Sequence, residues 1–478
     1  SYSNDKVSTN GDNTAIGYEA HRGNGGQNTV VGSYAVDNES GEADSIVVVG
    51  HQAMRGDTTA AADGTVAVGA FALGALTIGA ENTAVGYQSL QDMVDGAANT
   101  VIGYQAALDL NHADADGNVS IGAFTMDGVA GVALHSCTVV GTGALSGALT
   151  AGAVGSTAVG RNALGALTSG AGNTAVGYSA GDSLNVGQKN TILGYNALGA
   201  SVDGSYNVAI GYNALLAYEG SADAGENVVI GYNAGLYIST ATNSTFVGTA
   251  AGTGNSGQGL TGANNTAIGN SAGSELQVAA HENTFVGSTS GNTLTTGSDN
   301  TCVGFGSDTD DATAINQSVI GHNTTGVADN SVTLGNADVT DVYMAQDSGA
   351  IVHSGAVVHG LSAILLTTGT LAYATHTISK LKYVTVSADA QTLTLPAVQL
   401  GAVFIIVNIA ADGGALLTIS PNGSDKFATD IAGGVGTNDK DIINTKATQN
   451  QGDFVKLLGI SANHWAITEI GGIWVDEA

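Results

Sequence analysis

The sequence predicts an all-β protein whose larger part is a parallel β-solenoid. The first observation is a five-residue motif, Asn-Thr-Ala-Val-Gly at 173–177, which recurs in 19 copies up to residue 335. The second is the spacing of the copies, whose closing glycines lie 14 to 21 residues apart and most often 17. The third is that both faces of the motif are apolar, as in an internal parallel strand. A period this short and regular indicates one coil of a solenoid per repeat.

The fourth place of the motif is the expected core position. It is Val, Ile or Leu in all 19 copies, and it shares a strand face with the second place, which is almost always Thr or Val. We therefore expect the fourth-place side chains to fill the inside of the roll, each stacked on its counterpart one coil away. Representative core residues are Ile16, Val85, Ile102, Val159, Val176, Ile210, Ile268 and Val303.

The two ends of the motif predict turns. Glycine permits a positive φ or a close approach of another backbone. The opening asparagine, present in 12 of 19 copies, suits a turn whose side-chain amides stack between coils. Alanine recurs three places after the glycine in 13 copies, which predicts a second short strand. Representative turn residues are Asn82, Gly86, Asn173, Gly177, Asn265 and Gly269.

The chain divides into four segments. Residues 1–12 form a polar entry segment, 13–338 the repeat shaft, 339–371 a connector, and 372–478 a C-terminal module of about seven strands, a small sandwich or barrel. Both prolines and both tryptophans lie in the last 85 residues. The net charge also changes, from −26 over residues 1–379 to −4 over the remainder. These composition shifts mark the boundary of a second domain.

The repeat pattern Asn-Thr-Ala-Val-Gly-Tyr-x-Ala resembles the head repeats of trimeric autotransporter adhesins and the repeat shafts of bacteriophage tail fibres. This resemblance covers residues 13–335 and implies a left-handed parallel β-roll in a three-chain bundle. The runs Leu-Thr-Leu-Pro-Ala-Val at 393–398 and Gly-Asp-Phe-Val-Lys-Leu at 452–457 look like terminal domains of phage tail fibres. Nothing in the sequence resembles the coiled-coil stalk and membrane strands of an autotransporter, so we favour the tail fibre.

The resemblance implies a structural fibre protein of a phage tail or a similar extracellular appendage. Its expected location is the virion or an extracellular surface. Its expected partners are two further copies in a homotrimer, other tail or appendage proteins at the N-terminal end, and a host cell-surface glycan or protein at the C-terminal tip. A bacterial trimeric surface adhesin and a polysaccharide-degrading tailspike, with carboxylates facing each other between chains, are the alternatives.

The expected contact between chains is formed by small apolar residues. The third place of the motif is rich in alanine, as at Ala84, Ala158 and Ala209, and alanine also recurs three places after the glycine, as at Ala106. These positions would leave a smooth apolar face on each chain. We therefore expect them to face inward in a parallel trimer.

Composition argues against several classes of function. The chain has 11 Lys+Arg against 41 Asp+Glu, a formal net charge of −30, which argues against nucleic-acid binding. No apolar run approaches the length of a membrane span, so we expect no membrane insertion. With 43% hydrophobic and only 11% charged residues, the chain lacks the signature of disorder.

Residue patterns that could carry chemistry are sparse. His353 and His359 lie six positions apart without a carboxylate or cysteine beside them, so we interpret them as ordinary histidines rather than metal ligands. The acidic clusters at 114–118 and 308–311 contain calcium-type ligands without the spacing of an EF-hand loop, and solvated outer loops are the preferred interpretation over a bound cation. We therefore expect no catalytic residue, metal or cofactor, and no enzyme activity.

Cysteines and tyrosines have structural interpretations. Cys137 and Cys302 are nine coils apart, on the order of 40 Å at ~4.8 Å per coil, so they cannot form a disulfide within one chain. Seven tyrosines directly follow the motif glycine, and we expect them to stack between coils. They are Tyr18, Tyr87, Tyr104, Tyr178, Tyr195, Tyr212 and Tyr232.

Overall fold

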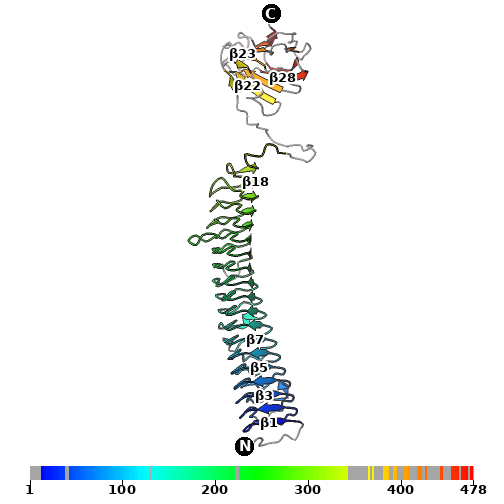
Figure 1. Ribbon diagram of the computed structural model, residues 1–478, viewed down its shortest axis with the longest axis vertical. Coiled ribbons are helices and arrows are strands. Elements are labelled where there is room, and N and C mark those ends of the chain that lie inside the picture. The colour runs from blue at the N-terminus through cyan, green and yellow to red at the C-terminus, as the bar shows by residue number, and fades with distance from the viewer. Residues whose placement is uncertain are drawn as a thin grey trace. The chain divides into compact units, whose positions relative to one another are not determined.

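The computed structural model describes residues 12–37, 42–129, 131–220 and 225–342, and within the later part of the chain strands β20 to β30 with Leu395 and Pro421. The chain forms two compact units, Ser1–Tyr343 and Met344–Ala478 (Figure 1). The connector histidines His353 and His359 lie outside the described residues.

The first unit is a parallel β-solenoid of 19 short strands, stacked one above another in Figure 1. Each strand pairs in parallel with the next strand of the chain, and equivalent motif positions lie opposite each other, as Thr174 lies opposite Thr191. Two 3-10 helices, η1 (Ala60–Ala62) and η2 (Ala151–Ala153), lie in the loops. The strands are β1 (Thr14–Ile16), β2 (Thr29–Val31), β3 (Val47–Val49), β4 (Val66–Val68), β5 (Thr83–Val85), β6 (Thr100–Ile102), β7 (Val119–Ile121), β8 (Thr138–Val140), β9 (Thr157–Val159), β10 (Thr174–Val176), β11 (Thr191–Leu193), β12 (Val208–Ile210), β13 (Val228–Ile230), β14 (Thr245–Val247), β15 (Thr266–Ile268), β16 (Thr284–Val286), β17 (Thr301–Val303), β18 (Gln317–Ile320) and β19 (Ser331–Leu334).

The motif glycine ends each strand because no other residue fits there. Gly86 has a φ of 138°, and a Cβ atom on it would lie 2.2 Å from the carbonyl oxygen of Gly103 in the next coil. Gly177 and Gly269 have φ values of 141° and would make equally short contacts. The glycine thus lets successive backbones pass closer than any side chain would allow.

The segment after each glycine is a turn rather than the second strand that the alanine pattern predicted. In the coil after β4, Phe71 and Leu73 adopt left-handed φ values of 62° and 51°, with Ala72 between them. The next coil repeats this at Gln88 and Leu90, with φ values of 57° and 50°. Alternating left-handed residues cannot continue a strand, so the chain bends around the coil.

The interior of the roll is filled by the third place of the motif, and the predicted register is wrong. Ala84, Ala158 and Phe246 are fully buried. The fourth-place residues point to the outside: Ile16, Ile102 and Ile268 are exposed, and the others are only half-buried. The eight residues predicted as core that lie on this outer face are Ile16, Val85, Ile102, Val159, Val176, Ile210, Ile268 and Val303.

The reason for the reversal is that the opposite wall of the coil supplies the large side chains. Leu90, four places after Gly86, and Met93, seven places after it, are both fully buried against the strand wall. This pattern recurs with Leu73 and Leu76 in the preceding coil. In these two coils the strand residue that faces them is small, Ala67 or Ala84.

Exceptions to this rule show volume compensation. Where the third place is Phe246, the position four after the glycine is Gly252, whose Cβ would lie 2.4 Å from the phenyl ring. Phe285 and Gly291 form the same pair, again with a 2.4 Å contact. In these two coils, therefore, one large side chain on the strand replaces the one that the turn supplies elsewhere.

The two cysteines do not form a disulfide with each other, as predicted, and both are buried. Cys302 occupies a third-place core position, and burial, with a smaller contribution from Asp308, raises the pKa of its thiol to about 12. Cys137 takes the first place of its motif, and burial raises its pKa as well. Both residues are therefore protonated at neutral pH and pack as small hydrophobic groups.

The second unit contains two sheets. The six-stranded sheet has the order β20 (Ile364–Leu366), β22 (Leu381–Val386), β24 (Val403–Asn408), β28 (Phe454–Ser461), β29 (His464–Gly471) and β26 (Lys426–Phe427). The five-stranded sheet has the order β21 (Gly369–Thr370), β23 (Gln391–Thr394), β25 (Leu417–Ser420), β27 (Ile442–Asn444) and β30 (Trp474–Asp476). Trp465 of β29 is fully buried and packs edge-on against Phe404 of β24 at 5.4 Å.

Candidate functional site

The shaft carries an exposed apolar stripe along the outer face of its strands. We define this outer stripe as the fourth-place aliphatic residues together with the aromatic residues that follow the motif glycine. Contiguous apolar surface on this scale marks an interaction site in soluble proteins. Its exposed members are Ile16, Val49, Ile102, Ile121, Leu193, Ile268, Val286, Ile320 and Leu334, with Tyr18, Tyr87, Tyr104, Tyr178, Tyr195, Tyr212, Tyr232 and Phe305.

The tyrosines of the outer stripe stack from coil to coil, as the sequence predicted. Tyr178 and Tyr195 have ring centroids 5.1 Å apart at 7°, and Tyr212 continues the stack at 5.2 Å and 8°. Tyr232 extends it by another coil at 5.3 Å. Since each ring covers the face of its neighbour, the row presents ring edges and hydroxyl groups outward.

Beside the stripe, a ladder of buried asparagines joins the coils internally. Asn190 donates its backbone N–H and its Nδ2 to Oδ1 of Asn173, both at 3.0 Å. Its Nδ2 also donates to the carbonyl of Gly204 at 2.9 Å, and its own Oδ1 accepts the backbone N–H of Asn207 at 2.9 Å. Each amide thus satisfies polar groups of two coils within a dry interior.

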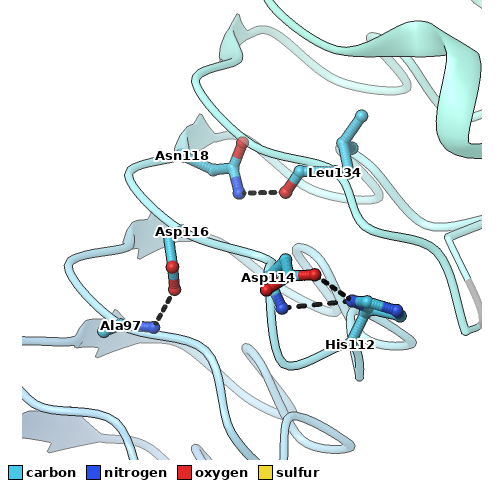
Figure 2. A network of polar contacts seen from close by, with 6 residues as sticks. All are labelled: Ala97, His112, Asp114, Asp116, Asn118 and Leu134. Carbon is cyan, nitrogen blue, oxygen red and sulfur yellow. Dashed lines mark hydrogen bonds and ion pairs between the residues drawn. The ribbon is translucent and has the colours of Figure 1, made fainter.

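The side chains of the first acidic cluster, at 114–118, do not converge on one point (Figure 2). Asp116 accepts the backbone N–H of Ala97 at 2.7 Å, whereas Asp114 lies against His112 at 3.8 Å. Asn118 turns inward and donates to the carbonyl of Leu134 at 2.8 Å. The ligand-type side chains are therefore used one by one to fix loops.

The second cluster is divided in the same way. Asp308 accepts from the backbone N–H of Thr293 at 3.1 Å, and Asp311 accepts from the backbone N–H of Thr313 at 2.7 Å. Burial raises the pKa of Asp308 above its usual value. These carboxylates shape the loop instead of forming a shared cage.

A group that the sequence reasoning missed is formed by His281, Glu282 and Asp299. Their ligand atoms lie within 4.8 Å of one another on adjacent coils. A spacing of one repeat between Glu282 and Asp299 is the signal that could have found them. All three are exposed, and exposed groups of this kind commonly occur without an ion, so the cluster does not by itself make a metal site.

Comparisons with known proteins leave the family open. No protein-family model matches the chain. No curated protein matches it in sequence. Within the described ranges, no helix has the length and apolar character needed to cross a membrane.

Proposed function

We propose that the chain is the subunit of an extracellular fibre of the phage tail-fibre type, with a solenoid shaft that holds a C-terminal tip out towards a host cell surface. The observation that carries this proposal is the unbroken parallel pairing of 19 strands, reinforced by the asparagine ladder. Such a stack supplies length and stiffness with no change of architecture along the way. This role places the protein in a virion or on another extracellular surface.

The proposed assembly is a parallel homotrimer that buries the outer stripe. Ala84, Ala106 and Ala158, which the sequence suggested for this contact, are buried inside their own chain. The outer stripe instead repeats once per coil, so only a partner with the same rise can match it over its whole length. A second copy in parallel has that rise, and rotational symmetry closes three copies into a bundle. The left-handed winding stays a prediction.

A charge on the outer stripe tests the assembly. We expect Leu193→Asp combined with Ile210→Asp to reduce the particle mass in light scattering from three chains to one, because the trimer would have to bury unpaired carboxylates. The control is Val202→Asp, half a coil away, since Leu193 and Val202 are equally exposed at 47%. A variant on the outer stripe that still has the mass of three chains would exclude this face as the contact.

Host recognition is proposed for residues 372–478. This part of the sequence holds both tryptophans and the aperiodic loops from which a specific site can be made. Trp465 is a core residue, so the proposed contacts are the stretches 422–446 and 461–464, within which the structure describes strands β26 and β27 and the adjoining ends of β28 and β29. Trimers that lack residues 372–478 should keep the shaft and lose attachment to host cells. Undiminished attachment would assign recognition to the shaft.

The location of the fibre separates a phage protein from a bacterial surface adhesin. Both would use the same shaft, and both would attach to cells. Gold-labelled antibodies against residues 13–338 should mark tails of virions in electron micrographs. Label on the bacterial envelope in uninfected cells would favour the adhesin instead.

A further inference from the structure

A polar hollow with a volume of about 390 Å³ opens on the side of the shaft at β3 to β5. It arises because the fifth place after the motif glycine differs in three successive coils, where it is Arg55, Gly74 and Gln91. Gly74 and Ala75, five and six places after their motif glycine, form a small floor, and the backbone N–H of Ala75 donates to the carbonyl of Gln91 in the next coil at 2.9 Å. The coil before supplies Arg55, and the coil after supplies Gln91 and Asp92.

The polar groups of the hollow have capacity for a ligand. Arg55 is exposed and is the only Lys or Arg between residues 23 and 160, and no carboxylate of the described residues lies within ion-pair distance of it. Oε1 of Gln91 is shielded and has no hydrogen-bond partner within the described part of the chain. The Gln91 side chain also hydrogen-bonds to Asp92, and its buried oxygen can accept a hydrogen bond from a ligand only if the amide turns towards the hollow. Gln52 adds a second amide to the wall.

The remaining wall is aromatic. Phe71 lines the hollow, and its ring packs edge-on between His51 and Tyr87, with ring centroids 5.7 Å and 6.0 Å away. Asp92 stands near Asp109, and burial together with this second carboxylate raises the pKa of Asp92. An anionic ligand would therefore meet unfavourable charge at this wall, although Arg55 would attract it.

We propose that this hollow binds a neutral saccharide unit of a glycan. The guanidinium of Arg55, the carboxylate of Asp92 and the two amides offer planar pairs of donors and acceptors, which match neighbouring hydroxyl groups on a sugar ring. The ring of Phe71 offers an apolar surface for the carbon-bound hydrogens of the same sugar. The volume lies within the range of about 300–1,000 Å³ that is typical of small-molecule sites. This inference does not depend on the role of the fibre.

The test is saturation-transfer NMR on the full chain with four probes: the methyl glycosides of glucose, galactose, mannose and N-acetylglucosamine. We expect saturation transfer to at least one of them. Arg55→Ala should reduce the signal several-fold through the loss of hydrogen bonds, and Ala75→Leu should abolish it by filling the floor. Circular dichroism checks that both variants keep the shaft.

The matched control is Ala166→Leu. Residues 163–167 repeat the sequence Ala-Leu-Gly-Ala-Leu of residues 72–76, but the neighbouring coils carry Ser146 and Asp182 where the hollow has Arg55 and Gln91. The control should bind the same probe as the unchanged chain. If none of the four probes shows transfer, or if Ala75→Leu binds as well as Ala166→Leu, the hollow is not a saccharide site.

Discussion

At the scale of single residues, the opening asparagine connects neighbouring coils. Asn283 donates Nδ2 to Oδ1 of Asn265 at 3.0 Å and to the carbonyl of Gly297 at 2.9 Å. Its own Oδ1 accepts the backbone N–H of Asn300 at 3.1 Å. Where the ladder is interrupted, the hydroxyls of Thr65 and Ser156 are buried with no partner among the described residues, whereas the hydroxyl of Ser244 still accepts the backbone N–H of Asn265 at 3.2 Å.

Loss of one ladder amide should therefore lower the free energy of unfolding substantially. Asn283→Ala leaves the backbone N–H of Asn300 and the carbonyl of Gly297 buried with fewer partners, and we expect a loss of about 2 to 3 kcal/mol in the free energy of unfolding. Chemical denaturation followed by circular dichroism measures it. Asn270→Ala, at an exposed position two residues after β15, is the control and should change stability by less than about 0.5 kcal/mol. Equal effects of the two changes would contradict a structural role for the ladder.

At the scale of the coil, packing is decided between the strand and the turn that faces it. Phe246 with Gly252 and Ala84 with Leu90 are two solutions for the same space. Leu90 already has a left-handed φ of 50°, close to the 55° of Gly252, so the backbone accepts leucine at this position. The interior of one coil can thus be exchanged for that of another.

This exchange makes a prediction about coupled substitutions. Phe246→Ala alone should cost about 3 to 5 kcal/mol through the cavity it leaves, and Gly252→Leu alone about 1 to 3 kcal/mol through overcrowding. The double variant should be more stable than the sum of the two losses by about 2 kcal/mol, since it recreates the Ala84 and Leu90 arrangement. A thermodynamic double-mutant cycle measures this coupling. Strictly additive losses would show that the two side chains do not share one space.

The same coil explains what the sequence could and could not predict. The turn residues Gly86 and Asn173 were predictable because a positive φ and a capping amide are local requirements. The inward face of the strand was not, because both faces are apolar and the choice depends on Leu90 and Met93, which come from the opposite wall. Large aliphatic residues at the fourth place suggested a core, yet they form the outer stripe.

The polar hollow could not be predicted from the sequence of a single repeat either. Arg55, Gly74 and Gln91 are separated by 17 to 19 positions and make a site only when successive coils are stacked. An alignment of the coils on the motif glycine shows the site at the fifth place after that glycine. This place is a long side chain in one coil, glycine in the next, and a long side chain again in the third. The acidic clusters at 114–118 and 308–311 show the opposite case. Their residues are close in sequence, but their side chains bond to different partners in the structure.

At the scale of the whole molecule, acidic charge dominates. The formal net charge is −30, and burial raises the pKa of several shaft carboxyl groups, including Asp92, Asp127 and Asp182. A carboxyl group with a raised pKa in the folded chain holds its proton where the unfolded chain has lost it. Its stabilising contribution is therefore present at low pH and is lost as the pH rises through the raised value.

The shaft should consequently tolerate mild acid well. We expect the midpoint of thermal unfolding to be higher at about pH 4 than at about pH 6, because the raised pKa values of these carboxyl groups lie above the ordinary value of about 4. Circular dichroism melting curves at constant ionic strength measure the shift. Asp92→Asn should reduce the difference between the two pH values. A midpoint that falls on acidification would contradict the sign of this effect.

The strict neighbour-to-neighbour pairing of the coils has a consequence for how such a protein changes over generations. β10 pairs only with β9 and β11, and Thr174, Thr191 and Val208 occupy equivalent register positions. Deleting or duplicating a whole coil, such as residues 178–194, joins two faces that already fit each other. Recombination between successive repeats can therefore lengthen or shorten the shaft in steps of one coil. The length of the shaft is thus a heritable trait that can vary while the fold stays the same.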